Sequence, residues 1–174
     1  MSLLVLLRRI AASFALAGSA VGFAAALLVV TSVSLRALTT RPIQGDVELT
    51  QFAIALAISL ALPWCQLRGA NIIVDFFTQR MRARSLRWLD GVGAALMAAM
   101  CALLAWRTSV GAIAVHDAGE TSMIRGLPMW WVYASLAPGL ALAALVAAAQ
   151  AALHFRNAPM GALVGSEHAP DTAA

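Results

Sequence analysis

Four long apolar stretches constrain this chain more than any other feature. Residues 10–35 hold no charged side chain, and further apolar runs cover residues 49–67, 88–114 and 128–153. About twenty residues of α-helix cross the ~30 Å hydrocarbon core of a bilayer, so each run can span a membrane. Only 11% of the residues are charged, whereas soluble domains carry about 25%. We therefore predict an all-α integral membrane protein, with four transmembrane helices in one domain over residues 1–156.

The arginines indicate how the helices are oriented. All twelve basic residues are arginine, and most lie between the apolar runs. Because cytoplasmic loops carry the excess of arginine and lysine, the side with more arginines is expected to be the cytoplasmic one. That side holds both termini and the segment between runs two and three, with eight arginines: Arg8, Arg9, Arg68, Arg80, Arg82, Arg84, Arg87 and Arg156. The outer side holds Arg36, Arg41, Arg107 and Arg125. The net charge of +4 thus reflects topology and lipid contacts, and no nucleic-acid partner is expected.

The segment between runs two and three is too polar to span. Its apolar residues fall on one helical face and Asp75 lies on the other, a pattern typical of a helix lying in the membrane interface. We predict a cytoplasmic amphipathic helix over residues 69–86, whose arginines reach lipid headgroups. The alternative is a cytoplasmic loop whose apolar face packs against the spans. The candidate lipid-contacting residues are Arg68, Ile72, Ile73, Asp75, Phe76, Phe77, Arg80, Arg84 and Arg87. Residues 157–174 are expected to form a disordered cytoplasmic tail.

The stretch GETSMIRGLPMWWVYASLAPG, residues 119–139, leads into the fourth run from the outer side. Pro128 suits the first turn of a helix, where a missing N–H costs nothing. Trp130 and Tyr133 are placed as an aromatic belt at headgroup depth. Glu120 and Arg125 are expected on the aqueous side. The other outer connection carries the acidic residues Asp46 and Glu48.

The spans lack the residues that transport or catalysis would require. None has a carboxylate at its centre, where ion-coupled carriers commonly place one. Asp90 lies at the inner edge of the third run and Arg107 near its outer end, and both are expected to anchor the helix by snorkelling. The chain has no phosphate-binding loop and no Ser/His/Asp constellation. It is not expected to be an enzyme.

Two weaker motifs also need an interpretation. His116 and His154 could serve as haem ligands, but the predicted topology puts them on opposite faces of the membrane. Cys65 and Cys101 lie far apart in apolar runs, which gives no metal or redox motif. Gly18 and Gly22 form a GxxxG pair, which permits close helix approach. Such pairs are common in membrane helices.

Taken together, these segments resemble one family. Over residues 5–155 the chain is similar to the small membrane subunit, the DctQ component, of tripartite ATP-independent periplasmic (TRAP) transporters. The resemblance rests on the order and spacing of RPIQGDVELTQF, with Gly45 and Glu48, of LRGANIIVDFF, and of GETSMIRGLPMWWVYASLAPG. The four-span layout with both ends inside also fits. The family usually has histidine where this chain has Asn71.

The resemblance implies a function. Such transporters sit in the bacterial inner membrane and import organic acids, for example C4-dicarboxylates or sialic acid. A periplasmic binding protein delivers the solute, and a large membrane subunit moves it with a sodium gradient. The small subunit forms a stable complex with the large subunit and braces its static part. No cofactor is then expected in this chain, and sodium binds the large subunit. Candidate partner contacts on the outer face are Asp46, Glu48, Glu120, Arg125, Pro128, Trp130 and Tyr133.

The residues alone also allow two other functions. One is a membrane anchor for a dehydrogenase or oxidase, with or without haem b. The other is a self-associating four-helix exporter, which would require a functional carboxylate inside a span.

Overall fold

The described residues form four long helices. The structure, a computed structural model, describes residues 2–39, 43–68 and 83–156. Helix α1 covers Ser2–Thr39, α2 Asp46–Leu67, α4 Ala83–Asp117 and α5 Trp130–Phe155. All four are long and apolar enough to cross a membrane, which confirms the predicted class. Prolines at positions 63 and 138 lie inside α2 and α5 without ending them.

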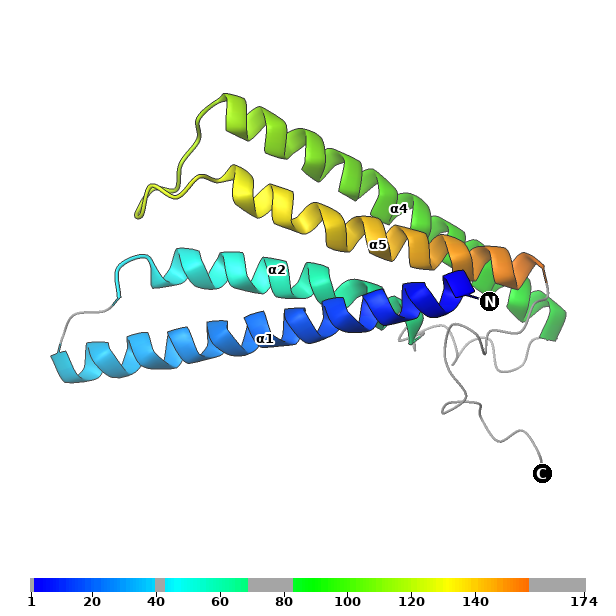
Figure 1. The fold of residues 1–174 in the computed structure, drawn as a ribbon, viewed down its shortest axis with the longest axis horizontal. Helices are drawn as coiled ribbons and strands as arrows, with labels where there is room; N and C mark the ends of the chain where they lie inside the picture. Colours follow the sequence, from blue (N-terminus) through cyan, green and yellow to red (C-terminus); the bar gives the residue numbers. More distant parts are fainter. Residues whose placement is uncertain (1, 40–42, 69–82, 157–174) are drawn as a thin grey trace.

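The helices form two antiparallel hairpins, α1 with α2 and α4 with α5. The hairpins meet mainly along α2 and α5, whereas α1 and α5 contact only slightly. In Figure 1 the helices therefore follow one another in the order α1, α2, α5, α4. We call the end that holds the α1–α2 connection and residues 118–129 the loop end. The opposite end, which holds the start of α1 and the end of α5, is the terminal end.

The observed helices exceed the predicted spans at most of their ends. Helix α1 extends beyond residues 10–35, and α4 runs from Ala83 to Asp117 instead of 88–114. Helix α5 begins at Trp130, two residues after the predicted start at Pro128. Residues 83–86 belong to α4, which corrects their assignment to the amphipathic helix. The rest of that predicted helix, residues 69–82, and the predicted tail lie outside the described residues.

Glycines allow the helices to approach closely within the chain. A Cβ atom at Gly18 would lie 2.9 Å from the carbonyl oxygen of Ala57 on α2. A Cβ atom at Gly139 would lie 2.3 Å from both the carbonyl and the hydroxyl oxygen of Ser59. The GxxxG pair therefore serves at least the α1–α2 contact, and Gly139 serves the α2–α5 contact, as small residues do between membrane helices.

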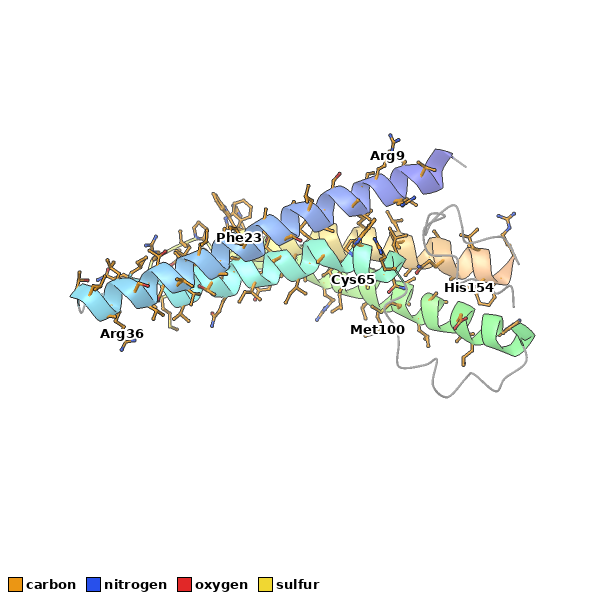
Figure 2. All side chains as sticks on the ribbon, turned by 90° about the horizontal axis from the view of Figure 1, so that it is seen from below. Arg9, Phe23, Arg36, Cys65, Met100 and His154 are labelled. Carbon is orange, nitrogen blue, oxygen red and sulfur yellow. The ribbon has the colours of Figure 1, made fainter. Side chains whose placement is uncertain are left out.

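The apolar core is small and lies where three helices meet. Ala11 of α1, Leu67 of α2, and Leu142 and Val146 of α5 form it, with Leu7, Phe14, Trp64, Ala149 and Leu153 packed around them. Elsewhere the helices leave most of their apolar surface uncovered. At most 28% of the most apolar stretch of any helix is buried. Phe23 of α1 is 67% exposed and lies between the labelled arginines near the two ends of α1 in Figure 2.

Candidate functional site

The connection between α4 and α5 is an ordered loop at the loop end. Helix α4 ends in a Schellman-type cap, in which the amides of Gly119 and Glu120 bond the carbonyls of His116 and Val115. Gly119 takes the positive φ of 62° that such a cap needs. A short hairpin follows, in which Thr121 pairs with Pro128. The loop therefore has a defined shape before any partner binds.

Glu48 fixes this hairpin to α2. Its carboxylate accepts a hydrogen bond of 2.9 Å from the Ser122 hydroxyl and one of 3.1 Å from the Ile124 amide. Ser122 is buried, and its hydroxyl oxygen also accepts the amide of Leu127 at 3.1 Å. A carboxylate that accepts two hydrogen bonds makes stronger contacts than a neutral acceptor would. The acidic side chain predicted for partner contact thus has partners within its own chain.

A second contact joins the same loop to the α1–α2 connection. The Arg125 side chain donates from Nε to the carbonyl of Gln44 at 2.9 Å. It passes over Gly45, where a Cβ atom would lie 2.8 Å from Arg125 Cγ. Gly45 also has a φ of 74°, which L side chains rarely adopt. We call these contacts of Gly45, Glu48, Ser122, Ile124 and Arg125 the loop clamp.

Asp46 connects two helices. Its carboxylate accepts a hydrogen bond from the hydroxyl of Ser32, which is 1% exposed, and another from the Val47 amide at 2.8 Å. The acceptor lies in the first turn of α2, where a negative charge is also favoured by the helix dipole. This contact holds the loop-end part of α1 against the start of α2.

The other residues predicted on the outer face also lie at the loop end. Glu120 is exposed, and its carbonyl accepts the amide of Met129. Pro128 lies in the hairpin and precedes α5 by two residues, which corrects its expected place in the first turn. The Trp130 ring packs edge-on against His116 with centroids 5.4 Å apart. Tyr133 lies beside Gly111 of α4. Their role in binding a partner stays a prediction.

At the terminal end, the structure describes one member of the predicted lipid-contacting set with its side chain. Arg68 caps α2, and its guanidinium carbon lies 5.2 Å from the centre of the Trp64 ring. This arrangement is a cation–π contact. Arg84 and Arg87 belong to α4. The remaining predicted positions, Ile72, Ile73, Asp75, Phe76, Phe77 and Arg80, lie outside the described residues.

Sequence reasoning missed the polar contacts between α2 and α5. The Gln66 side chain donates to Gln150 Oε1 at 2.9 Å, and Gln150 Nε2 donates to the Gln66 carbonyl at 2.9 Å. Both side chains are buried. The Ser59 hydroxyl donates to the Leu136 carbonyl at 2.7 Å. The sequence did indicate such a contact, because Gln66 and Gln150 lie in largely apolar spans and polar residues commonly join membrane helices.

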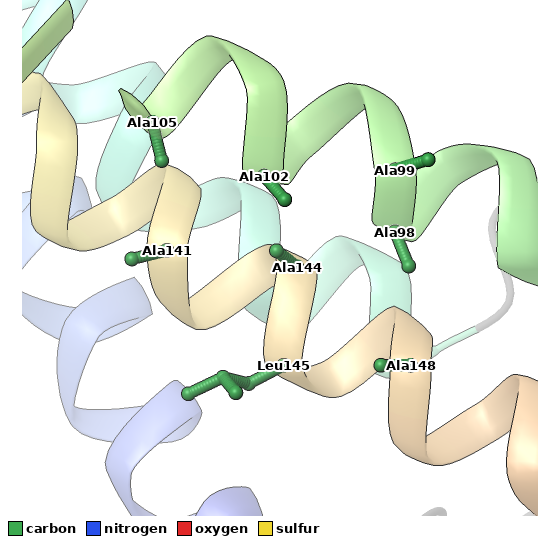
Figure 3. Close-up of a pocket in the computed structure, with 8 residues that line it drawn as sticks. All are labelled: Ala98, Ala99, Ala102, Ala105, Ala141, Ala144, Leu145 and Ala148. Carbon is green, nitrogen blue, oxygen red and sulfur yellow. The ribbon is translucent and has the colours of Figure 1, made fainter. Parts of the chain in front are cut away.

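An open groove of about 590 Å³ lies between α4 and α5. Figure 3 labels its lining residues: Ala98, Ala99, Ala102, Ala105, Ala141, Ala144, Leu145 and Ala148. No charged or hydrogen-bonding side chain lines it. Its surface is suited to contact with lipid chains or another apolar helix, not to holding a polar solute.

Comparison with known families decides between the functions that the residues left open. Residues 25–157 match the family described as "Tripartite ATP-independent periplasmic transporters, DctQ component". The chain belongs to this family. No curated protein and no solved structure matches the chain significantly.

As a DctQ component, the chain is the small membrane component of a tripartite transporter, which also comprises a large permease and a binding protein. Nothing supports the anchor alternative. His116 and His154 lie in the last turns of α4 and α5, at opposite ends of the bundle. One haem could not reach both.

Proposed function

We propose that this DctQ component is a non-catalytic subunit that braces the large permease, which imports a carboxylate with a sodium gradient. Its termini face the cytoplasm, and its loop end faces the periplasm. Family membership supports the role in transport, and the excess of arginines at the terminal end supports the orientation.

The exposed apolar faces of the helices support the proposal that this chain braces the large permease. Large apolar side chains such as Phe23, Leu16 and Leu38 on α1 are more than half exposed in the isolated chain. Lipid could cover them, and the apolar core where three helices of the chain meet is small. A stable complex with a large membrane subunit would cover part of this surface and hold both hairpins in place.

Reconstitution into liposomes tests the proposal. The large subunit is incorporated with or without this chain, and uptake of a carboxylate is measured with the binding protein and an inward sodium gradient. Uptake should require both membrane subunits and the sodium gradient. Full uptake by the large subunit alone would contradict bracing, and uptake independent of sodium would contradict the coupling.

The loop clamp is proposed to face the binding protein. Glu120 and the fully exposed Met123 lie on this loop, which the clamp holds in one conformation. Reversing Glu120 with Glu120→Lys should weaken uptake while the membrane complex stays intact. The matched control is Asp117→Lys at the end of α4. Equal uptake by wild type and both variants would contradict this contact.

A further inference from the structure

Arg107 lies farther from the loop end, measured along the bundle, than its sequence position suggested. Helix α4 continues for ten residues beyond it to Asp117, or about 15 Å of helix. Gly111 lies beside Tyr133, and Ala105 lines the same groove as Ala141, so Arg107 is level with the part of α5 between those two residues. That part is about 10 Å along α5 from Trp130. This level is deeper along the bundle than the predicted place near the outer end of the span.

Contacts with helix α2 show where this level of α5 lies along the bundle. Leu136 and Gly139, from the same level of α5, contact Ser59. Ser59 lies in the middle of the apolar part of α2. Arg107 is thus level with the central region of two uncharged helical segments. A charged side chain at this depth is costly and is commonly paired.

Within the described residues, Arg107 has no acidic partner. The one ion pair there joins His116 and Asp117 at 3.5 Å. Arg107 is exposed on α4. At 3.6 residues per turn it lies about 160° around the helix from Ala105, which faces α5. Arg107 therefore points away from its own bundle.

Snorkelling would not easily bring the guanidinium of Arg107 to the lipid headgroups. The Cα–Cβ bonds of a helix tilt toward its N-terminus, and α4 runs from the terminal end to the loop end. The side chain of Arg107 therefore starts toward the centre of the bilayer and away from the nearer surface. A lipid phosphate at that surface would be reached only against this direction.

The residues around Arg107 form an exposed strip along α4. They recur at alternating intervals of four and three, the spacing of a helix–helix seam. Met100, Leu103 and Val110 are 56%, 54% and 47% exposed, and Figure 2 labels Met100 on α4. We call this strip the Arg107 seam. It comprises Leu96, Met100, Leu103, Arg107, Val110 and Ala114.

We infer that the Arg107 seam binds a transmembrane helix of the large permease that carries an acidic side chain opposite Arg107. The inference rests on the proposed function and adds the face and the charge that join the subunits. A guanidinium pairs a carboxylate through two parallel hydrogen bonds, which would neutralise the charge at this depth. A second copy of this chain fits poorly, because two identical seams in the same orientation would bring like charges together.

Photo-crosslinking in the native complex tests the seam. A benzophenone amino acid is placed at Leu103 or Val110 on the seam, or at Ile113 on another exposed face of α4 as the control. The two seam positions should form adducts with the large subunit, and position 113 should not. Adducts with lipid alone, or with a second copy of the chain, would overturn the inference.

The charge is tested separately by substitution. Arg107→Leu should lower the amount of large subunit retained on the tagged chain at least about tenfold, because it leaves a buried acidic partner unpaired. Arg107→Glu should be at least as severe, and reversing the opposing acidic residue should restore binding. Arg36→Leu, at the loop end of α1, is the matched control and should bind normally.

These outcomes separate the inference from the proposed function. If the large subunit is retained equally by wild type and Arg107→Leu, the seam inference is wrong and the small-subunit function stands. If wild type retains no large subunit under any mild condition, the proposed function fails, and the inference fails with it.

Discussion

Single residues determine how closely α2 and α5 can pack, and Gly139 is the tightest case. A methyl group there would meet the Ser59 carbonyl, which belongs to the backbone and cannot rotate away. Gly139→Ala should therefore destabilise the protein by about 1–3 kcal/mol, the usual cost of overpacking. Gly93→Ala is the matched control, because nothing lies within 4 Å of its position. Thermal unfolding in detergent measures both, and equal melting temperatures would contradict the observed contact.

The buried glutamine pair makes a second prediction at this scale. Gln150→Leu removes the acceptor for the Gln66 side chain, which is then left unpaired between helices. The cost is expected to be about 1 kcal/mol, because polar contacts in membrane helices are individually modest. The double variant Gln66→Leu/Gln150→Leu should recover part of this loss, since no buried amide remains unpaired. Gln51→Leu, at an exposed position, is the control. A double variant as unstable as the sum of the two single variants would show that the pair does not interact.

At the scale of elements, the loop clamp makes the α4–α5 connection part of the fold. Glu48→Ala removes the acceptor of the Ile124 amide and of the Ser122 hydroxyl. Hydrogen exchange at Ile124 and Leu127 should become faster, because local opening then breaks fewer bonds. Glu120→Ala should leave this exchange unchanged, since the Glu120 side chain is exposed and its carbonyl remains. Unchanged exchange in Glu48→Ala would mean that the hairpin is held by its own backbone bonds.

The same elements show what the sequence could predict. Apolar runs of about twenty residues identify helical spans reliably, because a helix satisfies its own backbone hydrogen bonds in lipid. Of the loop-clamp residues, Glu48 and Arg125 were singled out for their charge, but their contacts were not predictable. Glu48 and Ser122 are separated by 74 residues, and a charge pattern alone does not reveal which distant groups meet. The level of Arg107 relative to α2 and α5 was not predictable for a related reason, since an arginine near the end of an apolar run resembles a span boundary.

At the scale of the whole molecule, two hairpins meet along α2 and α5 around a small core. This arrangement leaves long apolar faces exposed on α1 and α4, including the Arg107 seam. The buried polar contacts in the described part of the chain join helices to one another or join the α4–α5 loop to α2. The exposed faces are the surfaces that the proposed complex with a large membrane subunit would cover in part.

A small subunit of a TRAP transporter should be isolated together with its large subunit. Native mass spectrometry of the C-terminally tagged protein, released from its membrane in mild detergent, tests this expectation most directly. One copy of this chain should be bound to one copy of a large polytopic subunit. Complexes that contain only copies of this chain, or soluble dehydrogenase subunits bound to it, would show that it does not work as this small subunit.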